Sequence, residues 1–161
     1  MNGGNQITDM ETKQYLFGSL FLLSNKLQAL GDSYLQEITL KQWFLLMMIH
    51  HLNKEKPSVT EVAAYIGSTR QNVRKMLETL EAKGYVKLTV NPQDKRNLSV
   101  ELTSQTYCFF TQFEIKGNDF LQKLFSGIHL ELLENCRQTF EALFENMERM
   151  ENNNGENCSN L

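Results

Sequence analysis

Hydrophobic residues recur at helical spacing along most of the chain. Near the N-terminus, from Met10 to Leu30, they step alternately by four and three residues, at Leu16, Leu20, Leu23, Leu27 and Leu30. This spacing places them on one face of a helix and is typical of a helix that packs along a heptad seam. Gly31 follows the last of them, and we expect it to end this helix.

Capping boxes, in which a Ser or Thr is followed three residues later by Gln or Glu, predict where the next helices begin. The pairs are Thr39 with Gln42, Ser58 with Glu61, and Ser68 with Gln71. The first opens the run from Trp43 to Ile49, which is apolar nearly all round and therefore belongs at the centre of a core. The second helix is expected to end at Gly67 and the third at Gly84.

The hydrophobic period changes from helical to alternating after Gly84. Strict alternation of apolar and polar residues predicts two strands with one buried face, joined as a hairpin by the polar segment 91–97. The apolar positions are Val86, Leu88 and Val90 in the first strand and Leu98, Val100 and Leu102 in the second.

Helical spacing returns after the hairpin. Thr103 is expected to cap a long helix, and Ser126 with Gly127 predicts a break before a last one. The apolar positions are Tyr107, Phe110, Phe113, Phe120, Leu121 and Leu124 in the first of these helices and Leu133, Cys136, Phe140, Leu143 and Met147 in the second.

This order of elements predicts a mainly α fold with a small β-hairpin. A short helix, a tight turn, a second helix and a hairpin form the plan of a winged helix-turn-helix, whose second helix enters the major groove of DNA. We place this lobe at 39–102, between a helix at 10–31 and two helices at 103–150. With 161 residues the chain is expected to form a single domain, with flexible tails at 1–9 and 151–161.

The charge distribution fits this plan better than the net charge does. The whole chain carries a formal charge of −3, which is unusual for a protein that binds nucleic acid. Between Ser68 and Arg96, however, seven Lys and Arg residues stand against three acidic ones. The predicted recognition helix and hairpin are therefore locally basic, and the local charge decides affinity for DNA.

The predicted DNA contacts lie on the recognition helix and on the hairpin tip. Arg and Gln can pair with the edges of guanine and adenine, and the N-terminal end of a helix favours a phosphate. The helix contributes Ser68, Thr69, Arg70, Gln71, Asn72, Arg74 and Lys75, and the tip contributes Gln93, Asp94, Lys95 and Arg96. Such a tip suits an arm along the DNA backbone or in the minor groove.

At these residues the chain resembles the MarR family of bacterial dimeric winged-helix transcription factors. Asp94-Lys95-Arg96, followed by Val100-Glu101-Leu102-Thr103, is similar to the wing of that family and to the helix start behind it. Leu40-Lys41-Gln42-Trp43 and the run from Leu80 to Val86 also match. The family commonly has Gly shortly after the Leu-Thr pair, whereas this chain has Ser104-Gln105-Thr106-Tyr107.

The resemblance implies a homodimer that binds a pseudo-palindromic operator in double-stranded DNA and acts as a repressor. Arg96 would be the DNA-contacting arginine of the wing, oriented by Asp94, and the helices at 10–31 and 103–150 would form the dimer. Relatives also bind small aromatic ligands that relieve repression. The corresponding wall residues would be Tyr15, Phe17, Phe21, Trp43 and Phe113, for which plain core packing is the favoured alternative.

Other classes of function find little support in the sequence. The longest dense apolar run, Trp43 to Ile49, is too short to span a membrane, and we expect a cytoplasmic protein. His50 and His51 point in different directions on a helix, so no metal or other cofactor is expected. We find no nucleophile and base that would form an active site, so we do not expect an enzyme.

Two alternative functions stay open. The winged helix could serve protein interaction, as the acidic remainder of the chain allows. A redox sensor is the other alternative, because some relatives in this family sense oxidants through cysteine. The three cysteines, Cys108, Cys136 and Cys158, form no CxxC motif. We expect Cys108 and Cys136 to be reduced, buried and inert.

Overall fold

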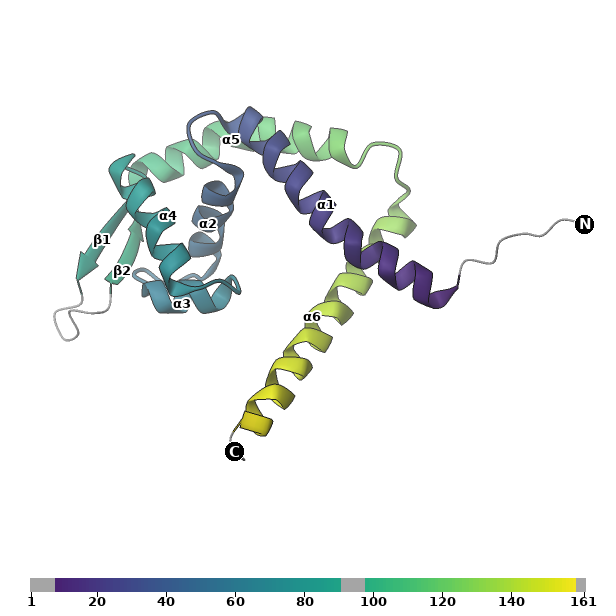
Figure 1. Ribbon diagram of the computed structural model, residues 1–161. Coiled ribbons are helices and arrows are strands. Elements are labelled where there is room, and N and C mark those ends of the chain that lie inside the picture. The colour runs from purple at the N-terminus through teal and green to yellow at the C-terminus, as the bar shows by residue number, and fades with distance from the viewer. Residues whose placement is uncertain (1–7, 91–97, 159–161) are drawn as a thin grey trace, which may run out of the picture. The chain divides into compact units, whose positions relative to one another are not determined.

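The computed structural model describes residues 8–90 and 98–158, with side chains described as far as residue 153. The described residues form six helices and one antiparallel hairpin (Figure 1). The elements in chain order are α1 (Asp9–Leu35), α2 (Leu40–His51), α3 (Val59–Tyr65), α4 (Arg70–Ala82), β1 (Val86–Val90), β2 (Leu98–Leu102), α5 (Ser104–Leu124) and α6 (Leu130–Cys158). The predicted fold class, mainly α with a winged helix-turn-helix, is confirmed.

The chain divides into two compact units, Met1–Thr111 and Gln112–Leu161, and helix α5 crosses the boundary. The hydrophobic core lies in the first unit, where α3 packs against α4 and β2, and α4 packs against β1. Its fully covered members are Leu45, Leu46, Val59, Val62, Val73, Leu77, Leu80 and Val100. As predicted, α2 lies in this core through Leu45, Leu46 and Ile49.

Two of the three predicted capping boxes are confirmed. The hydroxyls of Thr39 and Ser58 each accept a hydrogen bond at 3.2 Å from the backbone N–H three residues later. The box at Ser68 is wrong, because Thr69 caps α4 and accepts from Asn72 N at 3.2 Å. The backbone N–H of Ser68 instead closes the end of α3, where it donates to the Ala63 carbonyl after Gly67 at φ +63°.

Helix α1 continues past its predicted end. Gly31 lies inside the helix and is buried, and a Cβ at this position would approach the Leu40 side chain to within 2.7 Å. The glycine therefore permits close packing between α1 and the start of α2, and it does not end the helix. The chain turns only at Gln36, which has a positive φ of 57°.

The predicted hairpin is confirmed, but Val90, which was expected on its buried face, is 53% exposed. Val86 pairs with Leu102 and Leu88 with Val100, and Val100 is completely buried against the core. Val100 N also donates to the Pro57 carbonyl at 2.9 Å, so the loop before α3 fastens β2 to the helices. The tip of the hairpin, residues 91–97, is outside the described residues.

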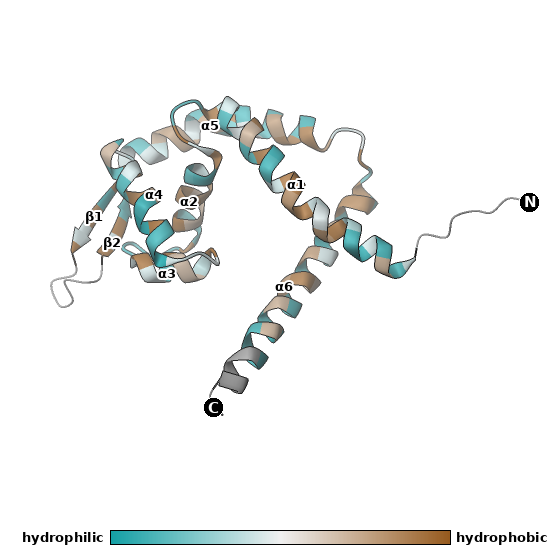
Figure 2. Cartoon of the chain, viewed as in Figure 1, coloured by the Kyte–Doolittle hydropathy of each residue, from teal (hydrophilic) through white to brown (hydrophobic). Residues whose placement is uncertain are grey.

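The second unit contains the end of α5 and all of α6. The predicted break at Ser126 and Gly127 is confirmed, with Gly127 at φ +78°. Helix α6 extends to Cys158, beyond the predicted end at 150. Figure 2 shows apolar residues at intervals along α6, and its described side chains are exposed except for half-buried Leu133. In the residues described, no helix is long and apolar enough to cross a membrane.

Candidate nucleic-acid interface

Helix α4 presents one apolar and one polar face. Val73, Leu77 and Leu80 point into the core and are fully buried, and Met76 is half-buried beside them. The opposite face is exposed and contains Thr69, Arg70, Gln71, Asn72, Arg74 and Lys75. Ser68, in the turn before the helix, is half-buried. The sequence therefore assigned the two faces of this helix correctly.

Arg74 is held on this face by a neighbour on the same helix. Its Nε donates to Glu78 Oε1 at 2.8 Å, and both side chains are about half exposed. An exposed pair of this kind contributes little to stability, so a stronger anionic partner can replace Glu78 at low cost. The guanidinium would then be available to a base edge or a phosphate.

The start of α4 is shaped for an anion. Thr69 caps the helix, and no acidic residue lies in its first turn. The positive end of the helix dipole is consequently not neutralised by a carboxylate on the same turn, and cations follow at Arg70, Arg74 and Lys75. This arrangement suits contact with the negatively charged backbone of a duplex.

The base of the wing adds an exposed cation. Lys87 on β1 is exposed and faces Glu101 on β2 across the hairpin. Glu101 also pairs with Lys56, from the loop before α3, at 3.2 Å. The predicted tip residues Gln93, Asp94, Lys95 and Arg96 lie outside the described residues, so their roles stay predictions.

The same region is the part of the chain that matches a known family. Residues 36–97 match the model of the MarR family. Over these residues the chain is similar to the MarR family.

Two curated proteins and a solved structure are also similar to this chain. The HTH-type transcriptional regulator PapX of Escherichia coli is 30% identical over 71 residues, which cover 44% of this chain and 43% of PapX. The HTH-type transcriptional repressor YetL of Bacillus subtilis is 29% identical over 100 residues, 61% of this chain and 60% of YetL. The chain thus spans less than two thirds of either relative. A mutant MarR from Escherichia coli, crystallised with operator DNA, has the same fold, with a TM-score of 0.70 and 23% identity over 84% of this chain and 99% of that one.

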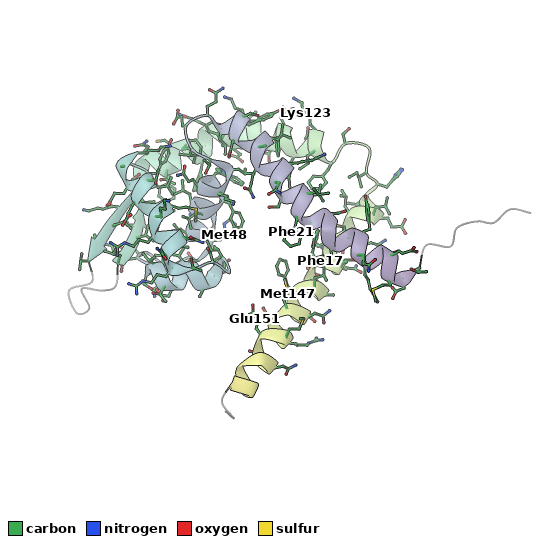
Figure 3. All side chains as sticks on the ribbon, viewed as in Figure 1. Phe17, Phe21, Met48, Lys123, Met147 and Glu151 are labelled. Carbon is green, nitrogen blue, oxygen red and sulfur yellow. The ribbon has the colours of Figure 1, made fainter. Side chains whose placement is uncertain are left out.

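The predicted ligand-wall residues fall at several places along the chain. Tyr15, Phe17 and Phe21 are exposed on α1, and the rings of Phe17 and Phe21 meet edge to face with centroids 5.2 Å apart (Figure 3). Trp43 is half-buried on α2. Phe113 is half-buried on α5, with Lys116 Nζ 5.2 Å from its ring centre. The structure brings Phe17 and Phe21 together, and a shared pocket stays a prediction.

The expectation that Cys108 and Cys136 are buried is wrong. Both cysteines are exposed in the single chain. Among the described residues, no group of three or more His, Cys, Asp and Glu side chains could hold a metal ion.

The sequence reasoning missed the polar contacts that hold α4 to its neighbours. Thr103 was expected to cap α5, but its hydroxyl donates to the Gly84 carbonyl at 2.7 Å and the Tyr85 carbonyl at 3.0 Å. The hydroxyl of Thr106 also donates to the Tyr85 carbonyl. On the other side, Tyr85 Oη donates to Glu37 Oε2 at 2.6 Å, across 48 positions of sequence. No local pattern predicts a contact between residues so far apart.

Proposed function

We propose that this protein is a sequence-specific DNA-binding transcriptional regulator that acts as a homodimer in the cytoplasm and catalyses no reaction. The observation that carries the proposal is the exposed face of α4, where Arg70, Arg74 and Lys75 stand on a helix anchored by its buried side. Because this helix is the second of a helix-turn-helix, its outer face is the one that such folds place in the major groove.

The relatives support this proposal. PapX and YetL bear the names of a transcriptional regulator and a transcriptional repressor, and the mutant MarR was crystallised with operator DNA. By analogy, we infer that this chain represses transcription from an operator of its own. Arg74 and Gln71 would read base edges, and Lys75 and the start of α4 would contact phosphates. Arg96, oriented by Asp94 and flanked by Gln93 and Lys95, would anchor the wing.

The terminal helices support the homodimer. On α1, Leu16, Leu20 and Leu23 are between 39% and 54% exposed, and on α6 Leu143 and Met147 are 41% and 49% exposed. Apolar surface of this extent on a single chain calls for a covering partner. A second copy is the simplest one, and a two-fold axis would present two recognition helices to a pseudo-palindromic site.

A small aromatic ligand would relieve repression by binding more tightly to a dimer that cannot hold its operator. Tyr15, Phe17, Phe21, Trp43 and Phe113 are the residues that we propose for its pocket. The ligand can change DNA affinity only by as much as its own affinity differs between the two dimer geometries.

Selection of duplexes from a fragmented genomic library, followed by binding measurements over a salt series, tests this proposal. We expect an enriched sequence with two related half-sites, and an affinity that falls linearly with salt on logarithmic axes. Recovery of no enriched sequence, or an affinity that does not change with salt, would contradict it.

A second exposed arginine, on α6, provides the matched control for Arg74. Arg149 on α6 is paired with Glu145 at 3.0 Å, as Arg74 on α4 is with Glu78 at 2.8 Å, and both arginines are exposed. Arg74→Ala should weaken binding to the selected duplex roughly ten- to hundredfold, the range for loss of a base contact. Arg149→Ala removes the same charge outside the winged helix and should leave binding nearly unchanged.

A further inference from the structure

The three residues that connect α4 to β1 are held by hydrogen bonds from α5. This junction, residues 83–85, turns at Gly84 with a φ of +83°. Gln105 Nε2 donates to the Lys83 carbonyl at 3.1 Å, and the Thr103 hydroxyl donates to the Gly84 carbonyl at 2.7 Å. Thr103 N donates to the Tyr85 carbonyl at 3.1 Å. Every backbone carbonyl of the junction therefore accepts a hydrogen bond from the first turn of α5 or the residue before it.

A single residue, Glu37, holds the junction from the other side. Its carboxylate accepts from the Tyr85 hydroxyl at 2.6 Å, and its backbone carbonyl accepts from Lys83 Nζ, also at 2.6 Å. The Tyr85 ring is only 2% exposed and meets Phe109 edge to face, with centroids 5.4 Å apart. Because packing fixes the ring, the position of Glu37 relative to the end of α4 is fixed as well.

Burial and the neighbouring carboxylate raise the pKa of Tyr85 to about 12. The hydroxyl therefore stays protonated and remains a hydrogen-bond donor at any pH at which the protein would bind DNA.

Glu37 is also joined directly to the end of α1. Gln36 has φ 57° and ψ −49°, and Glu37 N donates to the Leu35 carbonyl at 2.6 Å, which together define a γ-turn of the uncommon, strained type. A strained turn persists only where surrounding contacts maintain it. Here those contacts are the two hydrogen bonds that Glu37 accepts from Tyr85 and Lys83. A displacement of the last turn of α1 must therefore move Glu37 or break its two bonds.

We propose that Glu37 is a positioning residue that couples the C-terminal end of α1 to the orientation of α4 and the base of the wing. The inference rests on the proposed DNA-binding function. It adds a route by which a change at α1, such as a different packing of the dimer, would alter the presentation of the Arg74 face. The junction is the mechanical link, because α4 ends and β1 begins within it.

The test compares two duplexes, one enriched by the wild-type protein from a random library and one with the same bases scrambled. The readout is the ratio of affinities for the two, measured below the onset of thermal unfolding of each variant. Tyr85→Phe removes only the hydroxyl, Glu37→Ala removes the acceptor, and Glu37→Gln retains an acceptor oxygen. Glu55→Ala, in the exposed loop before α3, removes the same negative charge as Glu37→Ala and is the control.

We expect Tyr85→Phe and Glu37→Ala to lower the affinity ratio roughly tenfold, the size of a typical coupling between sites. Glu37→Gln and Glu55→Ala should stay within about twofold of wild type, and the double variant of Glu37→Ala with Tyr85→Phe should be no worse than either single one. If the contact only stabilised the fold, the unfolding temperature would fall and the ratio would not change.

The two proposals fail in different ways. If the wild-type protein enriches no duplex, the DNA-binding function is wrong and the coupling falls with it. If wild type discriminates and Tyr85→Phe discriminates equally well, only the coupling is wrong. Should Tyr85→Phe fail to fold, the comparison of Glu37→Ala with Glu37→Gln decides, and equal ratios for these two would overturn the role of Glu37.

Discussion

The winged helix buries its apolar side chains within the single chain, whereas the terminal helices leave many of theirs exposed. All described residues that are buried lie between Gly31 and Phe109, in the winged helix and the ends of the helices beside it. Helices α1 and α6 have 27 and 29 residues, yet on α6 no described side chain is buried. The winged helix therefore closes a core of its own, whereas the long helices present apolar residues that need cover.

The two regions also differ in what holds their helices. The short helices α3 and α4 are fixed at their ends by caps and at their inner faces by side chains with almost no exposure. Helix α6 is supported by surface ion pairs such as Arg137 with Glu134 and Glu141. Such pairs contribute little, so most of the stability of a long amphipathic helix must come from packing. We infer that the stability of α6 depends on dimerisation.

The largest expected effect is on the free energy of unfolding, when an isoleucine side chain is shortened to alanine in each region. Ile49 on α2 is 3% exposed, and Ile115 on α5 is 80% exposed. Ile49→Ala should lower the free energy of unfolding by about 2 to 5 kcal/mol, because it leaves a cavity in a closed core. Ile115→Ala should cost less than about 0.5 kcal/mol. Urea denaturation followed by circular dichroism measures both, and equal costs would show that the contrast in burial is wrong.

The next effect concerns the apolar face of α6. Leu143→Glu places a charge in the apolar stripe and should dissociate the dimer, while the helix-turn-helix core stays folded. Gln138→Glu adds the same charge on the opposite side of the helix and serves as the control. Light scattering after size-exclusion chromatography gives the mass of each variant. A monomeric wild-type protein, or dissociation by both substitutions, would contradict the proposed interface.

Much of the winged helix could be predicted because its signals are local. A capping box involves residues three positions apart, and alternation within five residues is enough to define a strand, so Thr39, Ser58 and Val100 were placed correctly. The outer face of α4 followed from the helical period of Val73, Leu77 and Leu80.

The features that escaped prediction depend on contacts between distant residues. Gly31 looked like a helix end, but its function is to let Leu40 approach α1. Ser68 looked like a cap, but its N–H is used by the end of α3. Glu37 carries no motif, and its contact with Tyr85 exists only once the fold has formed. Cys108 and Cys136 were expected to be buried because their apolar neighbours suggested a core within one chain.

A third prediction compares the DNA affinity of two Lys→Ala variants, one on α4 and one on α1. Lys75→Ala on α4 should lower affinity for specific and scrambled duplexes alike, and should reduce the slope of log affinity against log salt by about one. Lys26→Ala on exposed α1 should leave the slope unchanged. Fluorescence anisotropy over a salt series measures both slopes. Equal reductions would mean that DNA contacts both helices, or that the attraction depends only on net charge.

The smallest expected effect compares two capping boxes of the same kind, one in each region. Glu61 in the first turn of α3 and Glu11 in the first turn of α1 each accept a hydrogen bond from the backbone N–H of the capping residue. Glu61 also accepts from Lys54, and this contact, together with the bonds from Ser58, lowers its pKa from 4.5 to about 2. The pKa of Glu11 is lowered by its bonds from Thr8 alone. The two glutamates thus differ by one neighbouring ammonium group.

Because the folded state lowers the pKa of Glu61, its charged form stabilises the protein above the ordinary pKa of 4.5, and this contribution is lost as the pH falls towards about 2. Glu61→Gln keeps the capping geometry and should cost roughly 0.5 to 1 kcal/mol near neutral pH, since the carboxylate is half exposed and screened by solvent. The difference from wild type should disappear as the pH falls through about 2, and Glu11→Gln should show a smaller change of the same sign. Denaturation at a series of pH values, with carbon NMR titration of both carboxyls, measures this. A Glu61 carboxyl that titrates at its ordinary pKa would contradict this difference between the two capping boxes. Packing alone would then explain why the winged helix is more stable than the terminal helices.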